Sequence, residues 1–122
     1  MNTIRIKRIY DSPAPSDGTR ILVDRLWPRG MAREKAHVDA WLKDVAPSDA
    51  LRRWYSHAPE KWPEFRSRYL RELQQNPAVA ELREHAGKAK TVTLLFAARD
   101  DLRNNAVVLR AFLEGGAAVK ES

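Results

Sequence analysis

Two short runs of apolar residues set the main limit on how this chain can fold. Ile21, Leu22 and Val23 form the centre of the first run, over residues 20–25, and residues 91–98 hold the second. Neither run alternates with polar residues as a half-exposed strand does, so both predict strands buried on both faces of a parallel sheet. Residues 3–9 alternate between apolar and basic side chains and predict one more strand.

Apolar residues recur at helical spacing through most of the chain between the two buried strands. Strands that alternate with helices predict an α/β fold, here a small three-layer domain with a short, largely parallel sheet and helices packed on it. Residues 11–18 and 31–37 are expected to be irregular. The expected helices cover residues 38–45, a segment capped by Ser48, residues 61–75, and a segment that starts at Asn76-Pro77 and ends at Gly87.

A last helix is expected after the second buried strand. Asp100 or Asp101 can cap its start, and Gly115-Gly116 can end it. Residues 117–120 are then expected to form a short edge strand. The inward face of this helix is expected to carry Leu102, Ala106, Leu109, Phe112 and Leu113.

The composition narrows the class of protein. A length of 122 residues predicts one domain over residues 1–122. The absence of cysteine excludes disulfides, thiolate metal sites and cysteine nucleophiles, and the three histidines lack the spacing of metal ligands. Because the longest apolar run is far too short to span a bilayer and no signal peptide is evident, we expect a cytoplasmic protein without a membrane partner.

The net charge of +6 and the sequence pI near 10.0 favour anionic partners through long-range attraction. The 22 basic residues are scattered along the chain, however, and not gathered in one block. Nucleic-acid binding is therefore an alternative and not the leading expectation.

The strongest candidate site lies where the two buried strands end. If the strands are parallel, the loops that follow them meet at one edge of the sheet, where ligands commonly bind. Arginine side chains and the free N–H groups of a helix start suit a phosphate or carboxylate, and a carboxylate can act as a general base. We expect a small anionic ligand, with Asp24 and Asp100 as candidate catalytic residues and Arg25, Trp27, Arg29, Arg99, Asn104 and Asn105 as candidate ligand-binding residues.

Each of these residues also has a structural explanation. Asp24 can simply pair with an arginine, and Asp100 can simply cap the last helix. Trp27 can roof a pocket or plug the end of the core, and His57, near a helix end, can reach the site or only complement the helix dipole. The chain lacks the phosphate-loop, dinucleotide, serine-hydrolase and zinc-protease motifs, so no cofactor is expected.

Several motifs resemble the YeaO-like family of uncharacterised bacterial proteins. They are Asp17-Gly18, the run from Arg20 through Asp24-Arg25-Leu26-Trp27-Pro28-Arg29-Gly30, Trp41, Ala46-Pro47-Ser48, Leu51-Arg52, Phe65-Arg66 with Tyr69, and Leu94-Leu95 through Asn104. The resemblance covers nearly the whole chain. It implies a compact α/β domain and no established activity.

The same resemblance bears on one position of the candidate site. Its wider superfamily carries Asp-x-Arg after one strand and Cys-His-Arg after a later one. Asp24 with Arg25 matches the first loosely, and Asn104-Asn105 falls where the second lies. YeaO-like members tend to have Asn-His there, so the resemblance implies that Asn105 replaces a histidine.

Three functions remain open from the sequence. The first is a site for a small anionic ligand, with or without catalysis. The second is a protein-interaction or structural module that uses the charged strand-end edge. The third is nucleic-acid binding without base specificity. The sequence fixes neither the oligomeric state nor whether the protein is an enzyme.

Overall fold

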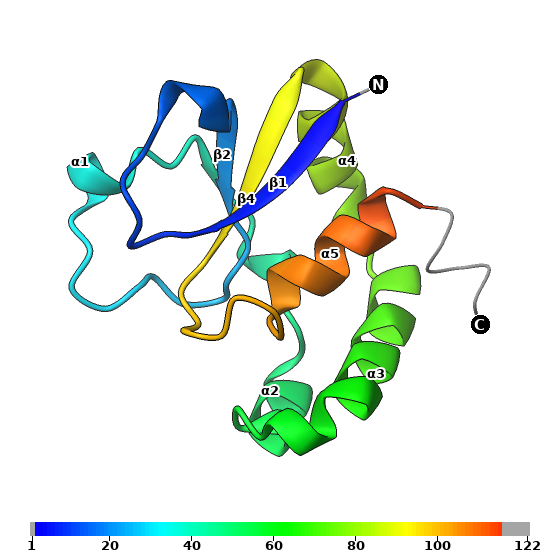
Figure 1. Cartoon of the computed structure of the whole chain (residues 1–122). Coiled ribbons are helices and arrows are strands. Elements are labelled where there is room, and N and C mark those ends of the chain that lie inside the picture. Colours follow the sequence, from blue (N-terminus) through cyan, green and yellow to red (C-terminus); the bar gives the residue numbers. More distant parts are fainter. Residues whose placement is uncertain (1, 116–122) are drawn as a thin grey trace.

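The computed structural model describes residues 2–115, which form a four-stranded parallel sheet with the strand order β1-β4-β2-β3 (Figure 1). The strands are β1 (Thr3–Arg8), β2 (Thr19–Leu22), β3 (Ala40–Trp41) and β4 (Thr91–Phe96). The α-helices are α1 (Arg33–Ala36), α2 (Asp49–Tyr55), α3 (Trp62–Gln74), α4 (Val79–Lys88) and α5 (Asn105–Leu113). Three short 3-10 helices cover Pro15–Asp17, Lys43–Val45 and Pro59–Lys61. The expected α/β fold is confirmed.

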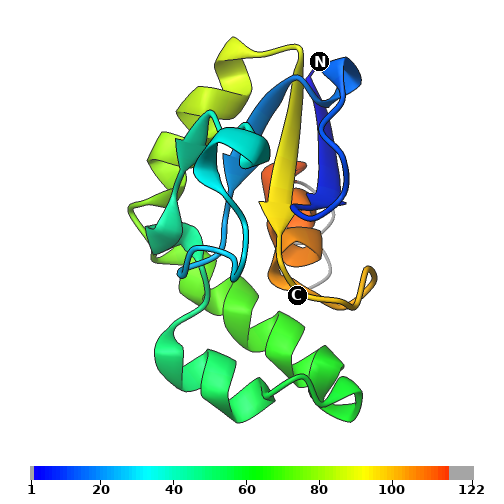
Figure 2. The same ribbon diagram turned by 90° about the vertical axis from the view of Figure 1, so that its left-hand side faces the viewer.

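The two faces of the sheet are covered very differently. Helices α3, α4 and α5 pack on one face, where Val92, Leu94 and Phe96 of β4 enter the larger core. The opposite face is covered by the 3-10 helix Pro15–Asp17 and by residues 24–39 with the single-turn α1, which stand in front of the sheet in Figure 2. Its smaller core joins Ile9, Leu22, Ala36 and Leu95.

A buried ionic cluster ties the second face to the sheet. Asp17 accepts hydrogen bonds from Lys7 Nζ at 3.1 Å and from Arg20 Nη1 at 2.6 Å, and only 4% of its surface is exposed. The other guanidinium nitrogens of Arg20 donate to the carbonyls of Ala36 and His37. Because Arg20 is also 4% exposed, the carboxylate is what neutralises it inside the protein.

The predicted strands at residues 3–9, 20–25 and 91–98 are confirmed, although they end earlier, at Arg8, Leu22 and Phe96. Ser48 caps α2 as expected, because its Oγ accepts a hydrogen bond from the Leu51 N–H. The long helix at 61–75 is confirmed as α3. Gly30 has the positive φ (+76°) that its place in a turn requires.

The expected helix over residues 38–45 is wrong. Asp39 N and Leu42 N donate to carbonyls of β2, so the segment pairs with the sheet as β3 and then forms a 3-10 turn. Trp41 is held at this edge of the sheet by a hydrogen bond from its indole N–H to the Asp24 carbonyl at 2.8 Å. This pairing partner lies far back in the sequence, so local periodicity does not reveal it.

Smaller differences occur elsewhere. Residues 33–36 of the segment expected to be irregular form α1, and α4 continues through Gly87 to Lys88. Leu102 is 74% exposed and does not face the core, because α5 begins only at Asn105. The edge strand expected at residues 117–120 lies outside the described residues. Within residues 2–115 no helix combines the length and the apolar character needed to cross a membrane.

Candidate functional site

The loops after β2 and β4 leave the same edge of the sheet, as the parallel pairing of the two strands requires. Asp24 joins them, because its Oδ2 accepts a hydrogen bond from the Ala97 N–H at 2.9 Å. Its Oδ1 accepts one from Asn105 Nδ2 at 3.1 Å, and the same amide group donates to the Val23 carbonyl. Asp24 and Asn105 therefore hold both strand ends and the start of α5 together.

The environment of Asp24 alters its acidity. Burial raises the pKa of this carboxyl above its usual value, while the hydrogen bonds from Ala97 and Asn105 lower it and offset part of the rise. Both carboxylate oxygens already have donors inside the protein. These contacts place Asp24 to organise the two strand ends, and its side chain does not line the cavity described below.

Replacing Asn105 by alanine should lower the free energy of unfolding by about 1–3 kcal/mol at neutral pH, because a buried carboxylate oxygen and the Val23 carbonyl lose their donor. A buried carboxyl with a raised pKa opposes folding when it ionises, so stability falls as pH rises through that pKa. Removing the amide raises the pKa of Asp24 further. The deficit should therefore shrink in acid, and urea unfolding at several pH values measures it. A deficit equal at every pH would contradict this role.

Arg25 turns away from the other strand-end residues. Its Nη2 lies 3.4 Å from the carbonyls of Ala46 and Pro47, and its Nη1 lies 3.9 Å from Asp44. Its buried Nε has no hydrogen-bond partner among the described residues. Arg25 thus links the loop after β2 to the segment before α2.

Trp27 and Arg29 lie on the loop-covered face of the sheet. The Trp27 indole donates to the Met31 carbonyl at 2.7 Å, and its ring meets that of Trp41 edge to face at 5.5 Å. The ring also packs against the smaller core, as expected for an aromatic that plugs the core. The Arg29 side chain is exposed, and its carbonyl accepts a hydrogen bond from the Tyr10 hydroxyl.

The loop after β4 is shaped by its own polar side chains. Asp100 accepts hydrogen bonds from the Leu102 and Arg103 N–H groups and from Arg103 Nε at 2.8 Å. These bonds, with the side-chain bond from Arg103 the largest, lower the pKa of Asp100. Asn104, and not Asp100 or Asp101, caps α5 by accepting from the Val107 N–H, while its amide donates to the Asp100 carbonyl.

This loop borders a cavity of about 420 Å³ at the strand-end edge. Its walls come from Tyr55, His57, Ala97, Ala98, Arg99, Asp100 and Arg103. Of the predicted site residues, the cavity brings together Arg99 and Asp100, with Asn104 directly behind them. Trp27, Arg29 and Arg25 do not line it.

Tyr55 and His57 enter the cavity from the end of α2, where the chain turns through two residues of positive φ, Ser56 and His57. Burial raises the pKa of the Tyr55 hydroxyl, and the charge of Asp100 adds to the rise, so the phenol stays a hydrogen-bond donor at neutral pH. Sequence reasoning missed Tyr55 because its helical spacing signals core packing, and it does stack on Phe65 at 4.4 Å.

The floor of the cavity is a fixed piece of backbone. Arg8 Nε donates to the Ala98 carbonyl at 2.9 Å, Arg8 Nη2 donates to the Ala97 carbonyl at 3.3 Å, and Asp24 holds the Ala97 N–H. Among the hydrogen bonds of residues 2–115, none is donated by the backbone N–H of Ala98 or Arg99. The N–H group of Asp100 has no partner either, and Ala98, Arg99 and Asp100 all line the cavity together with Arg103.

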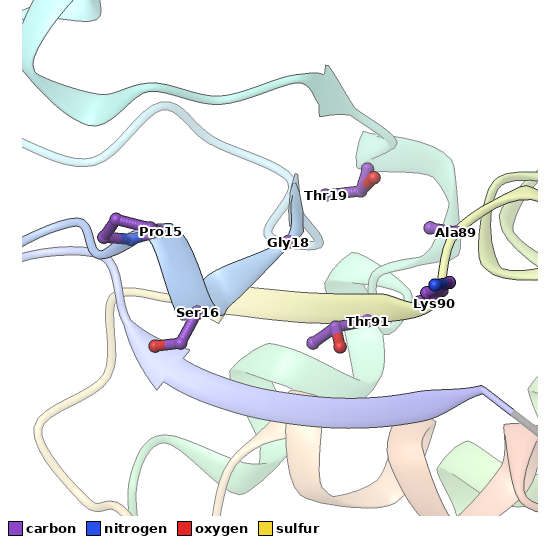
Figure 3. Close-up of a pocket in the computed structure, with 7 residues that line it drawn as sticks. All are labelled: Pro15, Ser16, Gly18, Thr19, Ala89, Lys90 and Thr91. Atoms are coloured by element: carbon purple, nitrogen blue, oxygen red, sulfur yellow. The ribbon is translucent and has the colours of Figure 1, made fainter.

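A second, more open cavity of about 320 Å³ lies at the opposite edge of the sheet (Figure 3). Pro15, Ser16, Gly18, Thr19, Ala89, Lys90 and Thr91 line it. It offers hydroxyl groups and one ammonium group, and no carboxylate, histidine or arginine. Across the described part of the chain, no group of three or more His, Cys, Asp or Glu side chains is placed to hold a metal ion.

Comparison with known proteins places the chain in a family. Its sequence is 46% identical over 112 residues to an uncharacterised protein of Mycobacterium tuberculosis, covering 92% of this chain and 94% of that protein. It is 39% identical over 110 residues to the uncharacterised protein YeaO of Escherichia coli, covering 90% and 96%. No solved structure matches. The family model of DUF488-N3i, described as the inactive DUF488-N3 subclade, matches residues 3–122. The chain therefore belongs to this YeaO-like, DUF488-N3i family of uncharacterised proteins.

Proposed function

We propose that this protein binds a small oxyanion, the phosphate or carboxylate group of a metabolite, in the cavity bordered by Tyr55, His57, Arg99 and Arg103. The observation that carries the proposal is the set of donors around one cavity. Two arginines and a phenol belong to residues that line it, and the backbone N–H groups of Ala98, Arg99 and Asp100 in its wall have no partner among the described residues. Arginine forks and preorganised backbone N–H groups are typical ligands of phosphate and carboxylate groups.

The one carboxylate in the cavity wall supports this assignment. Asp100 would repel an anion if it were free, but Arg103 and two backbone N–H groups already occupy its oxygens. Arg99 makes no ion pair with any described residue, so its charge remains available to a ligand. The cavity therefore presents excess positive charge.

We propose binding without turnover. Asp24 is engaged through both oxygens, Asp100 is paired, and the amide of Asn105 cannot transfer a proton where the family resemblance implies a histidine. The family description as an inactive subclade is consistent with such a site.

Replacing Arg99 by alanine should abolish ligand-induced stabilisation while leaving the fold intact, because the side chain is exposed and unpaired. Thermal unfolding with inorganic phosphate, sugar phosphates, nucleotides and small carboxylates measures this. A ligand at 100 times its Kd stabilises the native state by about 2.7 kcal/mol. Arg103→Ala should also abolish the ligand-induced stabilisation, because the Asp100 carboxylate would then lose its pairing partner and repel the ligand.

Arg71→Ala is the matched control, since Arg71 is an exposed arginine near the end of α3 and does not line the cavity. It should keep the full shift in Tm at the same ligand concentration. Equal shifts for the wild type, Arg99→Ala and Arg103→Ala would refute the assignment of the ligand to this cavity.

A further inference from the structure

A second surface lies on the loop-covered face of the sheet; none of its residues lines the cavity, although its Arg8 donates to the cavity-lining backbone of Ala97 and Ala98. We call the surface of residues 8–11 and 26–44 the loop face; α1 and its neighbouring loops stand toward the viewer in Figure 2. Three large hydrophobic side chains of the described residues are exposed, and two of them, Tyr10 (41%) and Leu26 (68%), belong to the loop face.

The aromatic side chains of the loop face are held rigidly. Arg33 lies over the Trp27 ring, with its guanidinium carbon 4.4 Å from the ring centroid, and reaches Trp41 at 5.6 Å. Arg8 covers the Tyr10 ring at 5.1 Å, and the Tyr10 hydroxyl is fixed on the Arg29 carbonyl. Tryptophan, tyrosine and arginine are the residues that dominate binding energy at protein interfaces, and rigid ones lose little entropy on binding.

The charges of the loop face decide what kind of partner fits. It carries five cations (Arg8, Arg29, Arg33, Lys35 and Lys43) and four acids (Asp11, Glu34, Asp39 and Asp44). Its local net charge is therefore +1, although the whole chain carries +6. A polyanion such as a nucleic acid would meet almost as many acids as cations here.

Within the described part of the chain, no cation of the loop face forms an ion pair with an acid of the loop face. Its one ion pair joins Asp44 to Arg25 at 3.9 Å, and the five cations have no carboxylate within 4.0 Å. A surface that carries both signs unpaired, around exposed hydrophobic side chains, is complementary to a copy of itself. Around a twofold axis, the cations of one copy meet the acids of the other.

We propose that the loop face is the contact between two copies of this chain, with Tyr10, Leu26 and Trp27 near its centre and the charged residues around them. The contact leaves the anion cavity open, because no residue that lines the cavity belongs to the loop face. We expect a reversible dimer whose population rises with protein concentration.

Sedimentation velocity of the full chain over a concentration series tests this directly. Leu26→Glu places a carboxylate at the centre of the contact in both copies and should raise the Kd at least about tenfold. Arg29→Glu is a second variant, which should weaken the dimer by disturbing the charge pattern at an exposed side chain. Leu102→Glu is the matched control, because Leu102 is 74% exposed and lies on the loop after β4, outside the loop face. This variant should dimerise as the wild type does.

Both leucines are solvent-exposed, so circular dichroism should show an unchanged fold for either variant. A dimer that Leu26→Glu dissociates and Leu102→Glu spares supports the proposal. A wild-type monomer at every concentration overturns it. So does a dimer that Leu26→Glu and Arg29→Glu leave intact, or one that Leu102→Glu dissociates equally.

Discussion

Replacing Asp17 by alanine should lower the free energy of unfolding by about 3–5 kcal/mol, with a fall in Tm of about 10–20 °C. Arg20 would remain buried with its charge uncompensated, and Lys7 and the Ala14 N–H would lose their acceptor as well. Urea unfolding of the two proteins measures the difference. Asp49→Ala is the matched control, because Asp49 pairs with Arg52 and Arg53 at the exposed surface, where such pairs contribute at most about 1 kcal/mol.

The same cluster predicts a pH dependence. Burial acts to raise the pKa of Asp17, but the hydrogen bonds from Ala14, Lys7 and Arg20 outweigh it and lower the pKa below its usual value. A lowered folded-state pKa means that this stabilisation is complete above the unfolded-state pKa of about 3.9 and is lost as pH falls through the folded-state pKa. Asp17→Asn should lack that acid-induced loss. An identical pH profile for both proteins would show that Asp17 is not the group responsible.

Gly18→Ala should lower the free energy of unfolding by about 3–5 kcal/mol, as Asp17→Ala does, because a side chain at this position has neither the space nor the backbone conformation it needs. Gly18 has φ +65° and ψ −137°, a conformation that residues with a side chain rarely adopt. A Cβ at this position would lie 2.1 Å from the Thr91 carbonyl oxygen of β4, and the sheet backbone cannot move aside without breaking its pairing.

Gly87→Ala is the matched control for this substitution. Gly87 lies in the last turn of α4, and a Cβ there would meet no atom within 4 Å. Alanine should stabilise the protein slightly, by about 0.5–1 kcal/mol, because it favours the helix and restricts the unfolded chain. If denaturant unfolding shows both variants equally stable, the close approach of Gly18 to β4 is not a constraint of the native fold.

The sheet was predictable because its strands have a local signature. Ile21, Leu22 and Val23 and the run that becomes β4 are apolar without alternation, and buried parallel strands require that pattern. The pairing of these strands then places Asp24 beside Ala97 and Asn105. The edge position of these residues therefore follows from the sequence.

The composition of the site was less predictable, because it depends on partners distant in sequence. Trp41 has helical spacing but joins the sheet through β2 and Asp24. Tyr55 and His57 line the cavity only because the chain turns at the end of α2. The Arg25 guanidinium group instead donates to the carbonyls of Ala46 and Pro47. Arg25, Trp27 and Arg29 therefore lie outside the cavity that Arg99 and Asp100 line, although we predicted one site for all of them.

Titration of the isotope-labelled protein with inorganic phosphate, followed by amide chemical shifts, tests the central claim most directly. If the cavity binds an oxyanion, the N–H signals of Ala98 and Arg99 should move most and saturate together, and Arg99→Ala should abolish the saturation while Arg71→Ala preserves it. Shifts that scatter over the basic surface without saturating, or that concentrate at Trp27 and Arg29 on the loop face, would contradict the account.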